Sequence, residues 1–215
     1  MADLLEEYFQ QSLFDFDFSP ELTNKKSNIT KNTDTNNRAG LIIKTSDGII
    51  MGHTPNETRD KNGWDLIKGH IETGEDAKTA VVREAKEECG LDIDESKLIE
   101  LGRNKYREGN ITFFGYELSE FTYKDLASLD CTSMFTWYTD DQGKILPKGK
   151  LSKHMAEFKE LDTFDIFEPS EVKTYMYQGL YNALTVKARI FIGDVTKIES
   201  VFELIYNKYN QRKPE

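Results

Sequence analysis

The chain has 215 residues, a formal net charge of −10 and a hydrophobic fraction of 38%. This length accommodates one ordinary domain with extensions, or two small domains. No run approaches the ~18 apolar residues that a membrane span requires. The acidic N-terminus lacks the basic segment and apolar core of a secretory signal. The surplus of acidic residues disfavours non-specific binding to nucleic acid, because such binding requires a basic surface.

The cysteines and histidines show no pattern of a disulfide framework or a zinc site. Cys89 and Cys131 lie far apart in the chain, and unpaired thiols are typical of a reducing compartment. His53, His70 and His154 are equally scattered. The composition therefore predicts a cytoplasmic protein with no membrane partner.

Hydrophobic patterning divides the chain into three regions. Residues 1–37 contain an acidic, aromatic segment and then a polar run, which predicts an extension with a flexible linker. Residues 38–188 carry the regular patterns of a folded domain. The last region, 189–215, contains an apolar stripe near 195–209, which predicts an amphipathic helix that packs on the core or on a second subunit of a homodimer.

The folded domain alternates between strand and helix patterns. The predicted elements are a hairpin at 39–54, a strand at 64–68, a helix at 76–90, a hairpin at 98–119, a strand at 129–138, a strand within 157–166 and a helix from Pro169 to about Ala188. Strands, a helix, more strands and then helices indicate an α/β fold with a mixed sheet covered on both faces.

The predicted helix at 76–90 concentrates acidic residues on one side. Glu84, Glu87 and Glu88 have the spacing i, i+3, i+4, so they share a face. That face borders the apolar arc that packs inward, where carboxylates repel one another unless they are paired or bind a cation. Ligands that offer only oxygen favour hard ions, so Mg²⁺ is the predicted guest and Mn²⁺ its substitute. Arg83 lies four residues before Glu87 and can hold its carboxylate in place with a bidentate contact.

The residues around this helix resemble the Nudix box, Gly-x5-Glu-x7-Arg-Glu-U-x-Glu-Glu-x-Gly-U, in which U is a bulky aliphatic residue. The fixed positions match at Gly69, Glu75, Arg83, Glu84, Glu87, Glu88 and Gly90. The one departure is Ala85, where the family prefers a larger side chain. The resemblance covers roughly residues 38–187 and implies a Nudix-type α/β/α sandwich with a central mixed sheet.

The resemblance implies a hydrolase that cleaves a nucleoside diphosphate linked to another moiety, by attack of a metal-activated water on phosphorus. Glu84, Glu87 and Glu88 would bind Mg²⁺, which also allows an acidic site to attract a phosphate substrate. Gly69 would allow the tight loop before the helix, and a nearby backbone carbonyl would add a ligand. Glu75, at the start of the helix, would cap its free amides and also stabilise the loop.

Many family members use one more glutamate from a downstream loop, as a metal ligand or as a base. Residues 155–164 resemble the stretch P-E-x-x-x-x-x-W-F of the family, with Ala156 in place of proline. This alignment assigns the additional role to Glu157, with Glu160 as the second candidate.

The sequence says less about which group is linked to the diphosphate of the substrate than about the metal site. Tyr106 lies 15 residues beyond the box, close to a tyrosine of the diadenosine-polyphosphate hydrolases in this family. The proline that ADP-ribose pyrophosphatases often place in that region is missing, so dinucleoside polyphosphates rank ahead of ADP-ribose and nucleotide sugars. The candidates for contact with a base are Trp64, Tyr106, Phe113 and Tyr116, and those for contact with phosphates are Lys68, Arg103, Lys105 and Arg107.

Two other functions stay open. The first is removal of diphosphate or a cap from an RNA 5′ end, which the net charge disfavours. The second is a Nudix-like nucleotide-binding regulatory domain without catalysis, which the complete set of glutamates disfavours.

Overall fold

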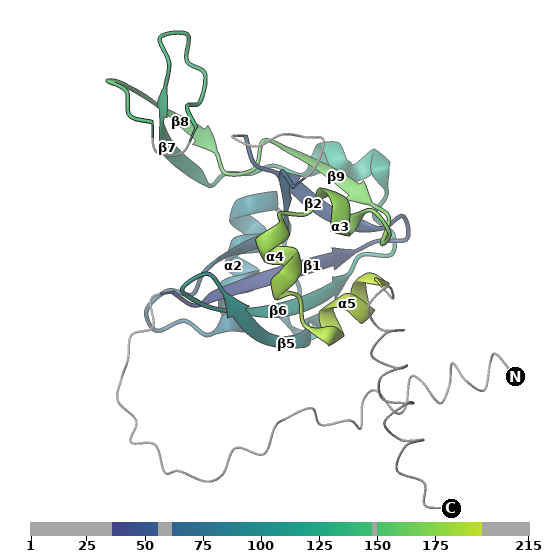
Figure 1. Ribbon diagram of the computed structural model, residues 1–215. Helices are drawn as coiled ribbons and strands as arrows, with labels where there is room; N and C mark the ends of the chain where they lie inside the picture. Colours follow the sequence, from purple (N-terminus) through teal and green to yellow (C-terminus); the bar gives the residue numbers. More distant parts are fainter. Residues whose placement is uncertain (1–35, 56–61, 148–149, 195–215) are drawn as a thin grey trace, which may run out of the picture. The chain divides into compact units, whose positions relative to one another are not determined.

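The computed structural model describes residues 36–55, 62–147 and 150–194 of the chain (Figure 1). The strands are β1 Arg38–Lys44, β2 Ile49–His53, β3 Trp64–Asp65, β4 Ile67–His70, β5 Ile99–Tyr106, β6 Gly109–Glu117, β7 Met134–Thr139, β8 His154–Lys159 and β9 Thr163–Phe167. The helices are α2 Ala77–Cys89, α3 Val172–Tyr175, α4 Gln178–Ala183 and α5 Val186–Ile192, with 3₁₀ turns at η1 Glu95–Lys97 and η2 Tyr123–Ser128.

A seven-stranded mixed sheet forms the centre of the described residues. Its main path runs β3-β2-β1-β6-β5, while β4 pairs with β1 and β9 pairs with β2. The pair β1–β6 is parallel and the other pairs are antiparallel. Strands β7 and β8 form a separate antiparallel pair. The hairpins predicted at 39–54 and 98–119 are both confirmed, as β1–β2 and β5–β6.

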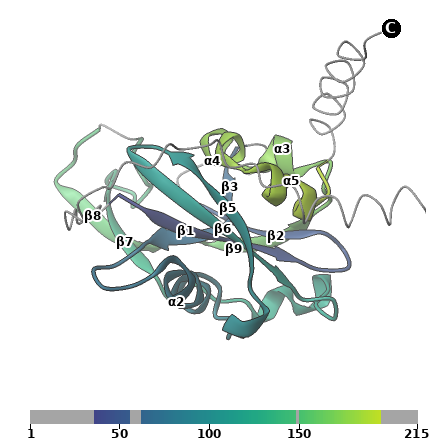
Figure 2. The ribbon, with the colours of Figure 1, turned by 90° about the horizontal axis from the view of Figure 1, so that it is seen from below.

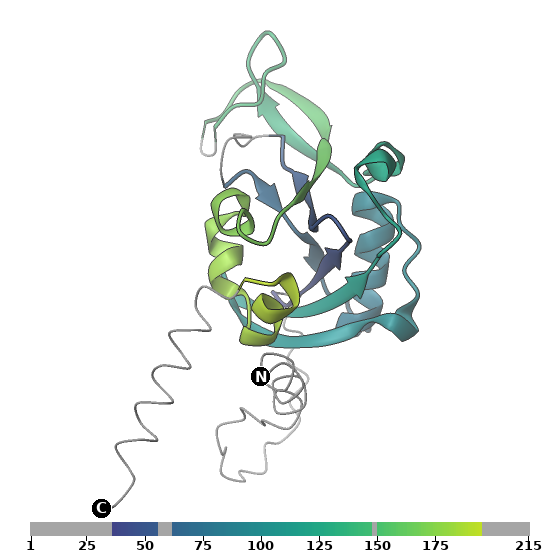
Figure 3. The same ribbon diagram turned by 90° about the vertical axis from the view of Figure 1, so that its right-hand side faces the viewer.

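Alternate side chains of the central strand β1 enter two different cores. Leu41 and Ile43 pack with the apolar side of α2, whereas Ile42 belongs to the cluster that contains Leu180 of α4 and Ile192 of α5. Figures 2 and 3 show α2 on one face of the sheet and α3, α4 and α5 on the other. The predicted α/β/α sandwich with a central mixed sheet is confirmed.

The prediction of one helix from Pro169 to about Ala188 is wrong. Three short helices occupy this region, because hydrogen bonds to the sheet interrupt the helical pattern. The backbone N–H of Tyr177 donates to the carbonyl of Trp64 at 2.8 Å, which ends α3 and attaches the chain to β3. Thr185 has an extended backbone, caps α5, and donates its hydroxyl hydrogen bond to the carbonyl of Leu101.

Three predicted strands have other limits. The strand at 64–68 divides into β3 and β4, and the strand within 157–166 corresponds to parts of β8 and β9. The strand at 129–138 begins only at Met134. The N–H groups of Thr132 and Ser133 donate to the carbonyl of Glu87, at 2.7 and 3.1 Å, instead of joining a strand ladder.

The predicted helix at 195–209 and the extension up to residue 35 lie outside the described residues. The domain limits 1–37, 38–188 and 189–215 therefore stay predictions, although α5 runs across residue 188. None of the helices in the described ranges is long and apolar enough to cross a membrane.

Candidate active site

Helix α2 carries the glutamates. A side-chain hydrogen bond defines its N-terminal end, and a glycine defines its C-terminal end. Asp76 is the N-cap, because its backbone is extended and its carboxylate accepts a hydrogen bond from the N–H three residues later. Gly90 ends the helix with φ 76°, a left-handed conformation that favours glycine. The predicted capping role of Glu75 is wrong, since Asp76 takes that position. Glu75 instead binds Arg83, and it stabilises the loop as predicted, because its Oε2 accepts a hydrogen bond from the N–H of Glu72 at 3.0 Å.

Arg83 connects the helix to the loop before it. Its Nε and Nη2 atoms donate to the two oxygens of Glu75, each at 3.1 Å. Its Nη1 donates to Glu84 at 2.7 Å and to Glu87 at 3.1 Å, and Nη2 also donates to the carbonyl of His70 at 2.8 Å. The predicted contact between Arg83 and Glu87 is present, but it is a single hydrogen bond, and the bidentate contact of Arg83 is with Glu75 instead. A guanidinium with this many fixed partners orients both helix carboxylates.

Glu84 lies against the backbone of β4. Its side chain is buried, and a Cβ atom on Gly69 would come within 1.9 Å of its Oε1. Burial raises the pKa of the Glu84 carboxyl, although Arg83 opposes this effect. Gly69 pairs with Ala39 of β1 and does not have a positive φ. The predicted reason for this glycine, a tight loop, is therefore wrong: the glycine makes room for a carboxylate.

Glu88 is the most deeply buried acidic residue of the helix, with 2% of its surface exposed. Its Oε2 accepts a hydrogen bond from the backbone N–H of Lys68 at 2.6 Å. Burial raises the pKa of Glu88 well above its ordinary value, and the charge of Lys68 opposes the shift only in part. The ammonium of Lys68 lies 2.7 Å from Asp65. Burial alone would lower the pKa of Lys68, but the charges of Asp65 and Glu88 raise it.

The donor chemistry of these side chains fits a hard divalent cation. Glu84 and Glu88 are buried, Glu87 is about half exposed, and all three offer oxygen only. Among the described residues, no three acidic, histidine or cysteine side chains are already arranged as a metal-binding group. The guanidinium of Arg83 instead donates hydrogen bonds to Glu84 and Glu87. Burial nevertheless raises the pKa values of Glu84 and Glu88, and a bound cation would favour the charged form of both carboxylates.

Glu160 is attached to this helix through a short series of backbone hydrogen bonds. Its N–H donates to the carbonyl of Ser133 at 2.9 Å, and the N–H of Ser133 donates to the carbonyl of Glu87 at 3.1 Å. The charge of Glu160 is close enough to contribute to the raised pKa of Glu84. Glu157 is exposed and lies in the separate β7–β8 sheet, opposite Thr136. The structure thus brings the second sequence candidate, Glu160, to the box glutamates.

The aromatic candidates are mostly part of the core. Phe113 is fully buried, and Tyr116 is buried with its hydroxyl near the N–H of Asp94. Trp64 packs edge-on against Phe167, with ring centroids 4.8 Å apart. Tyr106 is also buried, but its hydroxyl has no hydrogen-bond partner in the described part of the chain.

The basic candidates occupy different environments. Lys68 faces Asp65, directly beside the glutamates. Arg103 is exposed on β5 and donates to the side-chain oxygen of Asn37 at 2.9 Å. Lys105 is exposed on the same strand. Arg107 follows the end of β5 and lies over the ring of Tyr106, 5.2 Å from its centroid.

Comparison with known proteins identifies this arrangement. The family model described as the NUDIX domain matches residues 34–185, which is more than half of the chain. The chain belongs to the Nudix family. It is a Nudix hydrolase, an enzyme that acts on phosphorus anhydrides. No curated protein matches the chain.

Many solved structures are similar to this Nudix chain at low identity. The Nudix domain of Shewanella oneidensis NrtR, complexed with ADP ribose, shares 11% identity, with 84% of this chain and 96% of that chain covered and a TM-score of 0.44. An ADP-ribose pyrophosphatase from Streptococcus suis shares 16% identity, with 74% and 90% covered and a TM-score of 0.43. The MutT protein from Methanosarcina mazei shares 14% identity, with 76% and 94% covered and a TM-score of 0.39.

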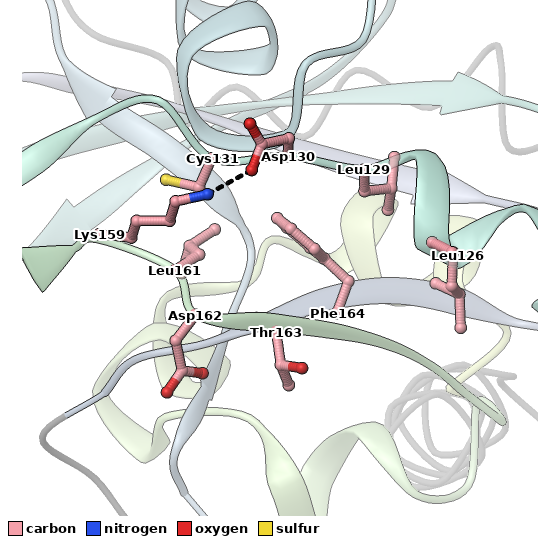
Figure 4. Close-up of a pocket in the computed structure, with 10 residues that line it drawn as sticks. Leu126, Leu129, Asp130, Cys131, Lys159, Leu161, Asp162, Thr163 and Phe164 are labelled. Carbon is pink, nitrogen blue, oxygen red and sulfur yellow. Dashed lines mark hydrogen bonds and ion pairs between the residues drawn. The ribbon is translucent and has the colours of Figure 1, made fainter.

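A cavity of about 280 Å³ lies between η2 and the segment that links β8 to β9 (Figure 4). Leu129, Leu161 and Phe164 line it, and an ion pair between Lys159 and Asp130 closes one side. Asp162 and Thr163 point away from this ion pair in Figure 4. Cys131 is buried at the edge of the cavity, and burial raises the pKa of its thiol. None of the box glutamates lines this cavity.

Three residues near the Nudix site were not predicted from the sequence. Asp65 binds Lys68, Arg38 lies over the ring of Tyr106 at 5.7 Å, and Tyr177 lies beside Arg107. Arg38 and Tyr177 are distant in sequence from the residues that they contact. Asp65 is close to Lys68 in sequence but lies outside the box. A single sequence offers no spacing signal that would have identified them.

Proposed function

We propose that this Nudix hydrolase is a Mg²⁺-dependent pyrophosphohydrolase that cleaves a nucleoside diphosphate linked to another moiety. The observation that carries this proposal is the burial of Glu84 and Glu88 against Gly69 and the N–H of Lys68. Burying two carboxylates beside each other is costly unless a cation joins them. Mn²⁺ is expected to substitute for Mg²⁺, because both prefer oxygen ligands.

The residues divide into metal ligands and supporting groups. Glu84, Glu87 and Glu88 are the proposed carboxylate ligands, and the carbonyl of Gly69 is a further ligand. Arg83 positions Glu84 and Glu87 through its hydrogen bonds. When bound, Mg²⁺ supplies neutralisation of the diphosphate and a more acidic water.

A further carboxylate is proposed to take the proton of the attacking water. We assign this role to Glu160 in preference to Glu157, because backbone hydrogen bonds fix the segment of Glu160 to helix α2. Its partial burial and its proximity to Glu84 suit a base close to the ligands.

Dinucleoside polyphosphates are the favoured substrates, followed by ADP-ribose and other nucleotide sugars. The position of Tyr106 relative to the box supports this order, and its unpaired hydroxyl offers a donor close to Asp65 and Lys68. The lower-ranked alternative is a triphosphorylated or capped RNA 5′ end. The negatively charged phosphate backbone of such an RNA would have to bind a protein whose net charge is −10.

The test is hydrolysis of a substrate panel with Mg²⁺, followed as phosphate release after a coupled phosphatase step. The panel contains diadenosine polyphosphates, ADP-ribose, NADH, deoxynucleoside triphosphates and a triphosphorylated RNA. Glu88→Gln is compared with Glu120→Gln, which removes an exposed glutamate elsewhere. We expect turnover that requires the metal, is lost in Glu88→Gln and is retained in Glu120→Gln. Nucleotide binding without turnover would support the regulatory alternative instead.

A further inference from the structure

Two arginines, one from strand β1 and one from the turn between β5 and β6, meet at one tyrosine. The guanidinium of Arg38 in β1 lies 5.7 Å from the ring centroid of Tyr106, and that of Arg107 lies 5.2 Å from the same centroid. Both distances are within the range of a cation–π contact. Arg107 also lies 5.7 Å from the ring of Tyr177, whose side chain is partly exposed. We call Arg38, Tyr106, Arg107 and Tyr177 the arginine–tyrosine cluster.

Carboxylates offset the positive charges of the cluster only in part. Burial and the charge of Arg107 lower the pKa of Arg38, and the charge of Glu108 opposes this shift without reversing it. Within residues 36–55, 62–147 and 150–194, neither Arg38 nor Arg107 forms an ion pair, although the chain carries a net charge of −10. Arg38 is partly buried, and its guanidinium donates a hydrogen bond to the carbonyl of Asn36 at 3.4 Å. Two guanidinium groups at one ring repel each other, so the cluster favours an anion that contacts both.

Two unfavourable features of the cluster point to the same ligand. Arg107 adopts a φ of 53° in the two-residue turn between β5 and β6, a conformation that favours glycine. Tyr106 is 4% exposed, yet its hydroxyl has no partner among the described residues. A phosphate oxygen would accept a hydrogen bond from this hydroxyl and from the guanidinium groups. Arg107 and Tyr177 also line an open cavity of about 150 Å³, together with Asp65.

The cluster lies next to the strand that leads into the box. Arg38 of β1 pairs with His70 of β4, directly beside the pair formed by Ala39 and Gly69. An anion that starts at the box glutamates can therefore continue past His70 to the arginines.

We propose that Arg38, Arg107 and the Tyr106 hydroxyl bind the phosphates beyond the scissile diphosphate, and so select substrates with three or more phosphates in the chain. This inference rests on the proposed function, because it places the scissile diphosphate at the box glutamates. Tyr177 forms the outer wall of the same region and is available to contact the distal nucleoside.

The experiment compares kcat/KM for diadenosine tetraphosphate and for ADP-ribose in five proteins: the full chain, Arg38→Gln, Arg107→Gly, Arg107→Lys and Lys124→Gln. Arg107→Gly removes the guanidinium but suits the left-handed backbone, so it does not threaten the turn. Lys124→Gln removes one exposed positive charge in η2, outside the arginine–tyrosine cluster. Melting temperatures verify that all five proteins are folded.

We expect both arginine variants to lose about 10- to 100-fold in kcat/KM for the tetraphosphate, the range of one charged hydrogen bond. ADP-ribose and the Lys124→Gln control should change by less than about threefold. Arg107→Lys should recover part of the loss, because it restores the charge but not the planar guanidinium. Equal losses on both substrates, or no loss on either, would overturn the proposal.

A binding measurement separates this inference from the proposed function. Calorimetry with inorganic tripolyphosphate and pyrophosphate, in the presence of Mg²⁺, requires no turnover. If the substrate panel shows no hydrolysis, the proposed function fails. The arginine site is still supported if tripolyphosphate binds more tightly than pyrophosphate and Arg107→Gly removes that difference. A difference that persists in Arg107→Gly refutes the site.

Discussion

Gly69 of β4 and Glu84 of α2 are packed so closely that a Cβ atom at position 69 would lie 1.9 Å from the Glu84 carboxylate. Real Cβ contacts do not reach this distance, so either the carboxylate or the strand would have to move. Position 69 therefore controls where the Glu84 carboxylate lies relative to the sheet.

Gly69→Ala should reduce kcat by about 100-fold or more, because a ligand displaced by about 1 Å has an effect of this size on a positioned reaction. The fold should survive, since Gly69 has no positive φ that an alanine would strain. The measurement combines kcat, Mg²⁺ affinity and a thermal melt. Unchanged kcat with normal folding would mean that Glu84 can relocate freely.

Glu88→Gln should stabilise the metal-free protein at pH 7. Burial raises the pKa of Glu88 in the folded state, so the unfolded chain loses this proton first as pH rises. The stability of the metal-free protein should therefore be greater below the unfolded pKa and should fall as pH rises through the folded pKa. A neutral amide removes this penalty, with an expected gain of roughly 1 kcal/mol.

Urea unfolding with EDTA between pH 4 and pH 8 tests this prediction. The variant should gain stability relative to the original chain mainly at the upper end of that range. Saturating Mg²⁺ should reverse the order, because it binds the folded protein through the intact carboxylate. A variant less stable than the original chain at pH 7 without metal would contradict the burial argument.

Glu75→Gln should destabilise the protein, opposite in sign to Glu88→Gln. The hydrogen bond from Arg83 lowers the pKa of Glu75 in the folded state, so its contribution is present above the unfolded pKa and is lost as pH falls through the folded pKa. We expect a loss of roughly 1 to 2 kcal/mol at pH 7, typical of a hydrogen bond between charged groups. Urea unfolding should show a smaller difference at pH 3 than at pH 7. An equal difference at both pH values would mean that the charge of Glu75 is not what matters.

The central part of the site was predictable because it depends on helical periodicity alone. The spacing of Glu84, Glu87 and Glu88 fixes their common face in any α-helix, and the same periodicity places Arg83 beside Glu87. Which of the three is buried depends on the sheet beneath the helix. Glu88 meets the N–H of Lys68, whereas Glu87 remains about half exposed.

Other features depend on contacts between distant segments and could not be read from local pattern. The apolar pattern of 169–188 is helical, but Tyr177 and Thr185 bond to β3 and β5 and divide it into three helices. The N-cap was ambiguous because Glu75 and Asp76 are adjacent acidic residues. The meeting of Arg38 with Tyr106 requires the parallel pairing of β1 with β6, which no short-range signal indicates.

Glu160→Gln and Glu157→Gln form a matched pair that decides which downstream glutamate assists the reaction. Both lie in one short segment and both substitutions remove one negative charge, but only Glu160 is linked to the Glu87 carbonyl through Ser133. We expect Glu160→Gln to lower kcat by about 100-fold, as expected for loss of a general base. Glu157→Gln should retain kcat within about threefold, since its side chain is exposed on the separate β7–β8 sheet. If Glu157→Gln shows the larger loss, the sequence alignment rather than the backbone geometry identifies the base, and the β7–β8 sheet must then move toward helix α2 when substrate binds.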